Sequence, residues 1–259
     1  MRDAIGKIKT AAQVLNLDEV GLCSRPDKGR VRRVAFLQTV NRQPTFREEQ
    51  DGSHVTLTAC VSLGGDSLKP HFCGMTECPL NTPDLALVSQ RFAYEKTAKG
   101  RQTTATFTNY CRTILKPYVE SVRQQLNDPR AVVYLILDNA PVHNIPDVLR
   151  EIGIHPIWLP AHSSHFLQVL DLLLFAELKK AYTSLRTPVT SPKVEGKVIR
   201  ILRAWHKARD PLTIIHAWNR ACIVLEPRAA GAGYRIQIPE EEVLRVIRTN
   251  CPDAQPPIP

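Results

Sequence analysis

The sequence has seven cysteines but no Cys-x-x-Cys pair. Zinc ribbons hold their metal through such pairs, and small secreted scaffolds rely on even sets of disulfide-bonded cysteines. The odd number and scattered spacing therefore indicate neither kind of protein. His71, Cys73 and Cys78 come nearest to a metal cluster, but no fourth ligand accompanies them. Buried thiols in a reduced compartment are the better interpretation.

The sequence also lacks a secretion signal and a membrane span. Its N-terminus, MRDAIGKIKTAAQ, is charged and has no apolar core. No apolar run approaches the roughly 20 residues that a transmembrane helix needs, and there is no internal repeat. These absences predict a soluble, intracellular protein without a membrane partner.

What is present is typical of a globular enzyme or binding domain. Of the 259 residues, 43% are hydrophobic and 23% charged, enough for one large domain with a substantial core. Lys and Arg outnumber Asp and Glu by 34 to 25, a net charge of +9 that favours a polyanion such as nucleic acid, although many basic proteins bind none. Two basic clusters are candidate nucleic-acid contacts: Lys28, Arg30, Arg32 and Arg33, and Lys197, Arg200, Arg203 and Lys207. For any single one of them, a solvated surface charge explains the residue equally well.

Hydrophobic periodicity predicts an α/β fold with a mixed five-stranded sheet flanked by helices. Residues 75–102 are polar and are expected to be irregular. The expected strands are 13–22, the two arms of a hairpin within 54–74, 132–137 and 154–160, and the expected helices are 104–126, 145–153, 164–182, 193–210 and 211–225.

The domain organisation follows from composition. Residues 1–186 are predicted to form the main domain. A Pro- and Thr-rich stretch then leads into residues 187–225, a C-terminal helical extension of the same domain. Residues 226–259 are expected to be a mostly irregular tail.

The stretch AVVYLILDNAPVHN ends an apolar strand on a carboxylate, Asp138. Asp171 poses the same problem on the helix 164–182, because Leu167, Leu174 and Phe175, one turn away, are all apolar and place it in the face expected to be buried. Asp18 interrupts a short apolar strand. An unpaired buried carboxylate costs several kcal/mol, roughly, so something must compensate.

Three such acids without cationic neighbours in sequence suggest a divalent-cation site, and oxygen ligands of this kind suit Mg²⁺ or Mn²⁺. Each acid also has a structural interpretation, as a turn former, a helix cap or the partner of a distant arginine. Glu19 is expected to point to the opposite face and to be structural. His143 either contacts a nucleic-acid substrate or closes the turn after Pro141.

Three segments, NLDEVG, LILDNAPVH and WLPAHSSHFLQVLD, resemble the three acidic motifs of the DDE superfamily of endonucleases and transposases. The branch that they resemble is the pogo type, with the centromere-binding protein B and jerky-like proteins, and the 32 residues between Asp138 and Asp171 agree with its spacing. Val20 and Val169 depart from the usual residues but remove no acid. The resemblance implies an RNase H-like fold in which Asp18, Asp138 and Asp171 form a catalytic triad that binds two Mg²⁺ or Mn²⁺ ions.

Transposases of this family carry a helix-turn-helix region ahead of the catalytic domain, whereas 17 residues precede Asp18 here. We therefore expect a fragment, a truncated copy of an element or a domesticated protein, without its own recognition of transposon ends. The partner that the resemblance implies is DNA. A second copy of the chain and a separate DNA-binding protein that recognises the transposon ends are further partners compatible with it. A DNA substrate would place the protein in the nucleus.

Three functions compete. The first is a metal-dependent DNA endonuclease or strand transferase, favoured by the intact triad. The second is a catalytically silent, domesticated nucleic-acid-binding module, favoured by the short N-terminus. The third is a nuclease that acts on RNA hybrids. It is less favoured because the residues of the motifs resemble those of transposases.

Overall fold

The structure is a computed structural model that describes residues 8–22, 54–78, 91–160, 163–185, 194–227 and 234–237. The basic cluster from Lys28 to Arg33 lies outside the described residues. The predicted C-terminal stretch 226–259 is described only in part.

A mixed six-stranded sheet forms the centre of the molecule, in the order β4-β3-β2-β1-β5-β6. β1 is antiparallel to β2, and β2 is antiparallel to β3. On its other side β1 is parallel to β5, and β5 is parallel to β6, so the sheet is mixed. The predicted mixed α/β architecture is confirmed. Its strands are β1 (Val14–Leu22), β2 (Val55–Ser62), β3 (His71–Gly74), β4 (Ala93–Lys96), β5 (Val133–Leu137) and β6 (Ile154–Trp158).

One strand more than the expected five is present. β4 lies within the stretch expected to be irregular and pairs in parallel with β3 at the edge of the sheet. Its four residues are only partly buried or exposed, so they lack the alternating apolar pattern by which a strand is recognised in sequence.

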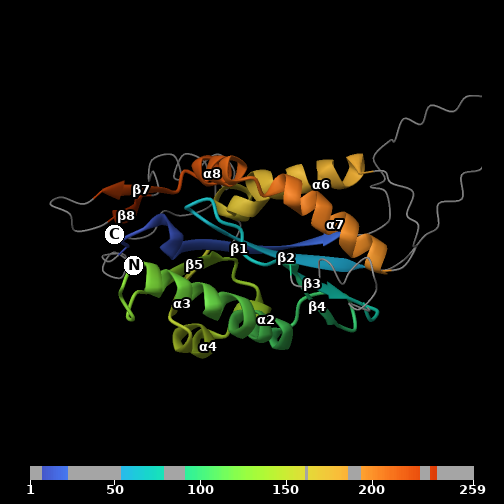
Figure 1. Ribbon diagram of the computed structural model, residues 1–259, viewed down its shortest axis with the longest axis horizontal. Helices are drawn as coiled ribbons and strands as arrows, with labels where there is room; N and C mark the ends of the chain where they lie inside the picture. Colours follow the sequence, from blue (N-terminus) through green and yellow to red (C-terminus); the bar gives the residue numbers. More distant parts are fainter. Residues whose placement is uncertain are drawn as a thin grey trace, which may run out of the picture.

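Helices cover both faces of the sheet (Figure 1). The layer on one face consists of α2 (Thr104–Tyr110), α3 (Lys116–Gln125) and α4 (Pro146–Glu151), with a π-helical segment, η3 (Cys111–Leu115), joining the first two. The layer on the other face contains α5 (Ser164–Leu167), η5 (Leu170–Leu174), α6 (Phe175–Ser184), α7 (Val194–Ala208) and α8 (Pro211–Arg220).

Alternation along β1 divides its side chains between these layers. Leu15 and Leu17 pack in the core beneath α2 and α3, whereas Val14 and Val20 pack in the core beneath the later helices. Because the side-chain period of a strand is two, Asp18 belongs to the α5–α8 face and Glu19 to the α2–α4 face. The expectation that the two acids face opposite ways agrees with this alternation.

The helix expected over 164–182 is broken. α5 ends at Leu167, Gln168 adopts an extended backbone with ψ 98°, and the chain re-enters a helix through the π-helical η5. Asp171 is consequently exposed, which corrects the prediction that it is buried. A π turn rotates side chains away from the 100° per residue assumed in that projection, and such turns are frequent at functional sites.

The C-terminal helices rest on the same sheet. Trp218 of α8 is fully buried and donates from Nε1 to the carbonyl oxygen of Ser62 at the end of β2, at 2.8 Å. Beyond α8, β7 (Val224–Pro227) and β8 (Tyr234–Gln237) form a two-stranded antiparallel sheet. Within the described residues, no helix is long and apolar enough to cross a membrane.

Candidate active site

The three aspartates come from three different elements. β1 and β5 run in parallel with Asn16 opposite Ile136, and the same register carried two residues further brings Asp18 beside Asp138, just past the end of β5. Asp171 follows the break after α5, in η5. β1 and η5 contact each other directly. The predicted meeting of strand, strand end and helix therefore takes place.

A pair of buried amides fixes the break that presents Asp171. Asn16, fully buried beside Asp18 on β1, donates from Nδ2 to the Gln168 side chain and accepts the Leu170 amide at 3.1 Å. Gln168 in turn donates from Nε2 to the Leu17 carbonyl at 3.1 Å. Sequence reasoning assigned no role to Asn16 or Gln168. The available signal was that both amides lie inside the acidic motifs.

Asp18 and Asp171 are mutually unfavourable as two carboxylates. Asp18 is 9% exposed, and burial, together with the negative charges of Asp171, Glu19 and Asp138, raises its pKa well above the usual range. Partial burial of the Asp171 carboxyl group also raises its pKa, although Lys179 opposes that shift. Among the described residues, the charge of Lys179 therefore only partly offsets the repulsion between these two carboxylates.

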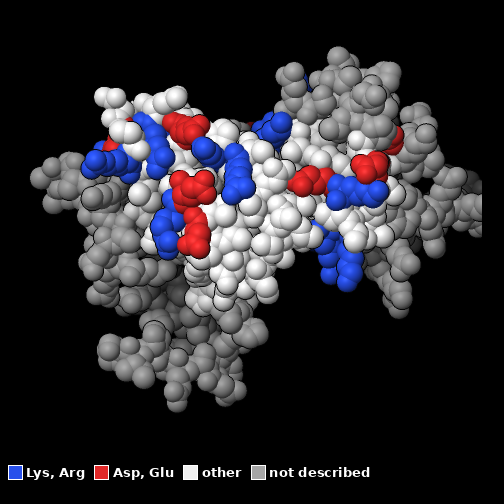
Figure 2. Space-filling view, turned by 90° about the horizontal axis from the view of Figure 1, so that it is seen from below, with Lys and Arg blue, Asp and Glu red and all other residues white. Residues whose placement is uncertain are grey.

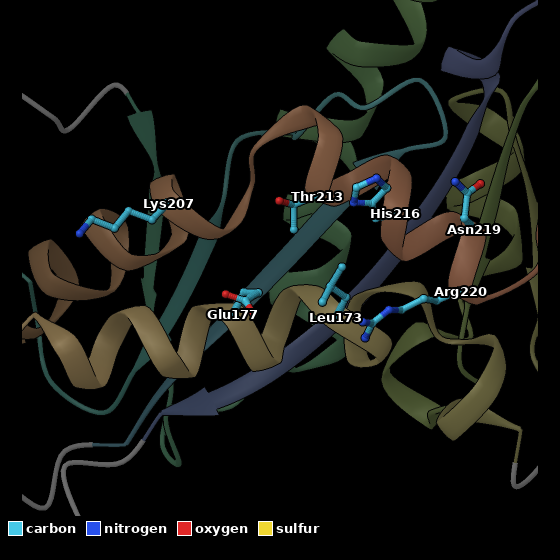
Figure 3. Close-up of a pocket in the computed structure, with 7 residues that line it drawn as sticks. All are labelled: Leu173, Glu177, Lys207, Thr213, His216, Asn219 and Arg220. Carbon is cyan, nitrogen blue, oxygen red and sulfur yellow. The ribbon is translucent and has the colours of Figure 1, made fainter.

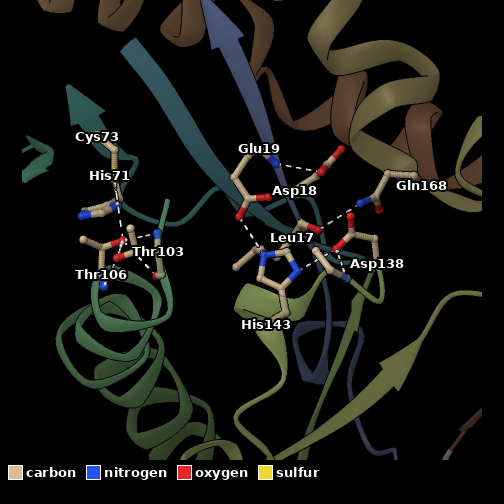
Figure 4. A network of polar contacts seen from close by, with 11 residues as sticks. Leu17, Asp18, Glu19, His71, Cys73, Thr103, Thr106, Asp138, His143 and Gln168 are labelled. Carbon is tan, nitrogen blue, oxygen red and sulfur yellow. Dashed lines mark hydrogen bonds and ion pairs between the residues drawn. The ribbon is translucent and has the colours of Figure 1, made fainter. Parts of the chain in front are cut away.

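Asp138 is in a different electrostatic environment. His143 Nδ1 lies 2.6 Å from Asp138 Oδ1, and His143 Nε2 lies 2.9 Å from Glu19 Oε1, so the ring bridges two carboxylates (Figure 4). Burial alone would lower the pKa of His143, but the bonds to Asp138 and Glu19 outweigh it and raise the pKa to about 10. The same bond from His143 lowers the pKa of Asp138. Glu19 therefore belongs to the site, a role that sequence reasoning did not assign.

The donor set fits a divalent cation. Three carboxylates converge from β1, the end of β5 and η5, and the pKa of Asp18 is raised partly because the other acids are near. A hard cation relieves such repulsion and prefers oxygen ligands. In the described part of the chain, however, no three His, Cys, Asp or Glu side chains are close enough together to hold a metal ion as they are placed. A cation would have to draw the carboxylates together.

The predicted nucleic-acid contacts separate into two groups. His143 is fully buried and Lys197 is 6% exposed, so neither presents a surface to DNA, which corrects both predictions. Arg200 donates from Nε and Nη2 to the Tyr182 carbonyl and lies over the ring of that residue, where it joins α7 to α6. Arg203 and Lys207 are exposed as predicted.

Lys207 lines an open hollow of about 460 Å³ between η5, α6, α7 and α8 (Figure 3). His216 and Arg220 face the same hollow, with Glu177 as its acidic member. The three aspartates are not among the described residues that line it. On the face that carries α2, α3 and α4, the described charges of both signs are interspersed (Figure 2). That described face therefore offers no surface of a single sign to a polyanion.

Four of the five described cysteines agree with the expectation of buried thiols. Cys60, Cys73, Cys78 and Cys111 are free and buried, whereas Cys222 is free but only partly buried. His71, the histidine nearest to two of them in sequence, pairs with Glu95 at 2.9 Å between Nε2 and Oε1, and its Nδ1 lies 4.0 Å from Cys73 Sγ. Burial raises the pKa of Cys73 to about 12, so this thiol is protonated at neutral pH.

Residues 53–188, more than half of the chain, match the DDE superfamily endonuclease family. The chain therefore belongs to that family. Its fold is similar to that of Mos1 transposase in the paired-end complex with the left transposon end, with a TM-score of 0.50 and 16% identity over 82% of this chain and 52% of that chain. The Mos1 mariner paired-end complex with Mn matches at 15% identity and a TM-score of 0.50, over 82% of this chain and 53% of that chain.

This chain spans about half the length of those Mos1 chains, and at such identities the likeness concerns the fold alone. The fold is the RNase H-like fold that the motifs imply: a mixed sheet with helices on both faces and additional helices at the C-terminus.

Proposed function

We propose that the chain is the catalytic domain of a metal-dependent DNA endonuclease and strand transferase of the pogo type, and that Asp18, Asp138 and Asp171 hold two Mg²⁺ or Mn²⁺ ions. The observation that carries this proposal is the convergence of three carboxylates from three elements, with the pKa of Asp18 raised by burial and by the neighbouring acids. When bound, the ions would activate an attacking water or hydroxyl and stabilise the leaving oxygen of a phosphodiester.

The chain's own residues have distinct parts in this function. Asp18 is held on a central strand, so it offers a fixed ligand position. Asp171 is exposed and follows a helix break held by Asn16 and Gln168, so it can approach the ions from the open side. DNA is the proposed partner, and the Mos1 chains of similar fold include one solved with a transposon end and one with Mn.

Exposed basic side chains would supply the affinity for phosphates without choosing a sequence. Arg203 and Lys207 remain in this role. Recognition of transposon ends by a separate protein, dimerisation of the chain and residence in the nucleus belong to the same proposal.

The test is nicking of supercoiled plasmid by the purified chain in Mn²⁺. We expect the wild type to nick and Asp18→Asn and Asp171→Asn to fall below detection, because each removes a ligand. Asp147→Asn is the matched control, since the Asp147 side chain is 91% exposed and pairs with Arg150 on the surface. Nicking that survives in Asp18→Asn would overturn the assignment of the triad.

A silent nucleic-acid-binding module is the second candidate. It is favoured by the absence of a ready-made metal group among the described residues and by the ion pair that already occupies Asp138. If this candidate holds, the wild type binds DNA equally well in EDTA and in Mn²⁺ and nicks nothing.

A further inference from the structure

Glu19 and His143 form a chain of contacts that ends on Asp138. His143 is fully buried, with Nδ1 at 2.6 Å from Asp138 Oδ1 and Nε2 at 2.9 Å from Glu19 Oε1. Its ring packs against Phe107 of α2, with a centroid distance of 4.7 Å. Both ring nitrogens are therefore bonded and the ring contacts Phe107, which leaves the imidazole a single orientation.

The contacts on Asp138 are uneven between its two oxygens. Oδ1 accepts from His143 and also from the Ala140 amide, at 3.2 Å. Within the described residues, Oδ2 has no hydrogen bond. A carboxylate held through one oxygen presents the other at a defined place, which is what a metal ligand requires.

We infer that Glu19 is a positioning residue for the metal centre: it holds His143, which fixes Asp138 through Oδ1 and leaves Oδ2 to bind the cation. This inference rests on the proposed function, because it takes Asp138 as a metal ligand. Glu19 itself touches no cation in this arrangement, since its side chain points to the α2–α4 face of the sheet.

A second histidine–glutamate pair on the same sheet is a matched control. His71 of β3 and Glu95 of β4 also lie 2.9 Å apart, with His71 1% exposed, and they involve none of the three aspartates. If a buried His–Glu pair merely supported the fold, shortening either glutamate would have the same effect on metal binding.

The experiment measures the affinity of the metal-free protein for Mn²⁺ alone, from the electron paramagnetic resonance signal of the free ion. Glu19→Asp keeps the charge but cannot reach His143, and Glu19→Gln keeps an acceptor at the same reach but loses the charge. We expect Glu19→Asp to weaken Mn²⁺ binding about tenfold or more and Glu19→Gln by less than about threefold. Glu95→Asp should leave the affinity unchanged.

The opposite order, with Glu19→Gln weak and Glu19→Asp normal, would mean that Glu19 acts only through its charge and would overturn the inference. Equal affinity in all Glu19 variants and the wild type would overturn it as well. Asp18→Asn separates this failure from failure of the proposed function. If it weakens Mn²⁺ binding while the Glu19 variants do not, the metal centre stands without the positioning role. If the wild type binds no better than Asp18→Asn, both fall.

Discussion

Two buried histidines lie on the α2–α4 side of the sheet, and each has a glutamate oxygen 2.9 Å from its Nε2. Both rings contact the aromatic side chains of α2: His143 lies beside Phe107, and His71 lies 5.8 Å from Tyr110. Burial lowers the pKa of His71 in spite of Glu95, whereas the pKa of His143 is raised to about 10.

The difference comes from the second carboxylate. His71 bonds to one acid, Glu95, and that bond together with the charge of Glu19 does not offset the desolvation of the charged ring. His143 meets two, Glu19 and Asp138, and together they do. One imidazole is thus neutral and supports the fold, whereas the other is a cation that offsets part of the negative charge of the acidic site.

The largest expected effect is on the free energy of unfolding when each ring is removed. His143→Ala leaves two carboxylates without their cation, a change that costs about 3–5 kcal/mol when the pair is fully buried. The Asp138 side chain is 38% exposed, so we expect the lower end, about 3 kcal/mol. His71→Ala removes a neutral ring and should cost about 1–2 kcal/mol. Urea denaturation of the metal-free proteins measures both, and equal losses would contradict the comparison.

The next largest effect is a difference in sign: substituting two of the aspartates should change the stability of the metal-free protein in opposite directions. Asp138→Asn weakens the bond to His143 and should lower the stability of the metal-free protein by about 1 kcal/mol. Asp18→Asn removes a charge that burial and Asp171 disfavour, and it should raise stability by about the same amount. Thermal denaturation in EDTA should show shifts of about 2–4 °C in opposite directions.

Mn²⁺ completes this test. At ten times its dissociation constant, one ion would stabilise the wild type by about 1.4 kcal/mol and leave Asp18→Asn unchanged. Shifts of the same sign for both aspartates in EDTA would show that the two halves of the site do not differ electrostatically.

Much of the fold could be predicted from sequence because it depends on local patterns. The apolar run of β5 and the alternation of β1 can be recognised in the sequence without knowing which strands they pair with. Asp18 and Asp138 could be singled out because they interrupt those patterns. β4 was missed because an edge strand needs little apolar surface. The exposure of Asp171 was missed because a π turn is held by Asn16 and Gln168, more than 150 residues apart.

The role of Glu19 was beyond sequence reasoning for a similar reason. The face of the sheet to which the Glu19 side chain points follows from alternation along the strand, but its partner His143 is 124 residues away in the sequence. Nor does a spacing rule indicate that a histidine will be buried between two acids. Lys197 shows the converse: its place in a basic helical cluster suggests a surface charge, yet the residue is 6% exposed.

The smallest effect separates the histidines by pH. Because burial lowers the pKa of His71, its contribution to stability is present above about pH 6.5, the unfolded value, and is lost as the pH falls through the folded value. One proton limits the slope to about 1.4 kcal/mol per pH unit. The stability of the wild type should therefore fall on acidification more steeply than that of His71→Asn. His165→Asn, which removes an exposed imidazole on α5, is the control.

Urea denaturation at intervals between pH 7 and 5 measures this difference. His143 should cancel from this difference because both proteins keep it; a histidine with a raised pKa contributes stability that is complete below about pH 6.5 and is lost as the pH rises toward 10. If His71→Asn and the wild type lose stability in parallel, His71 takes up its proton in the folded protein as easily as in the unfolded chain. One glutamate would then be enough to hold a buried imidazolium, and the second carboxylate at His143 would not be the cause of its charge.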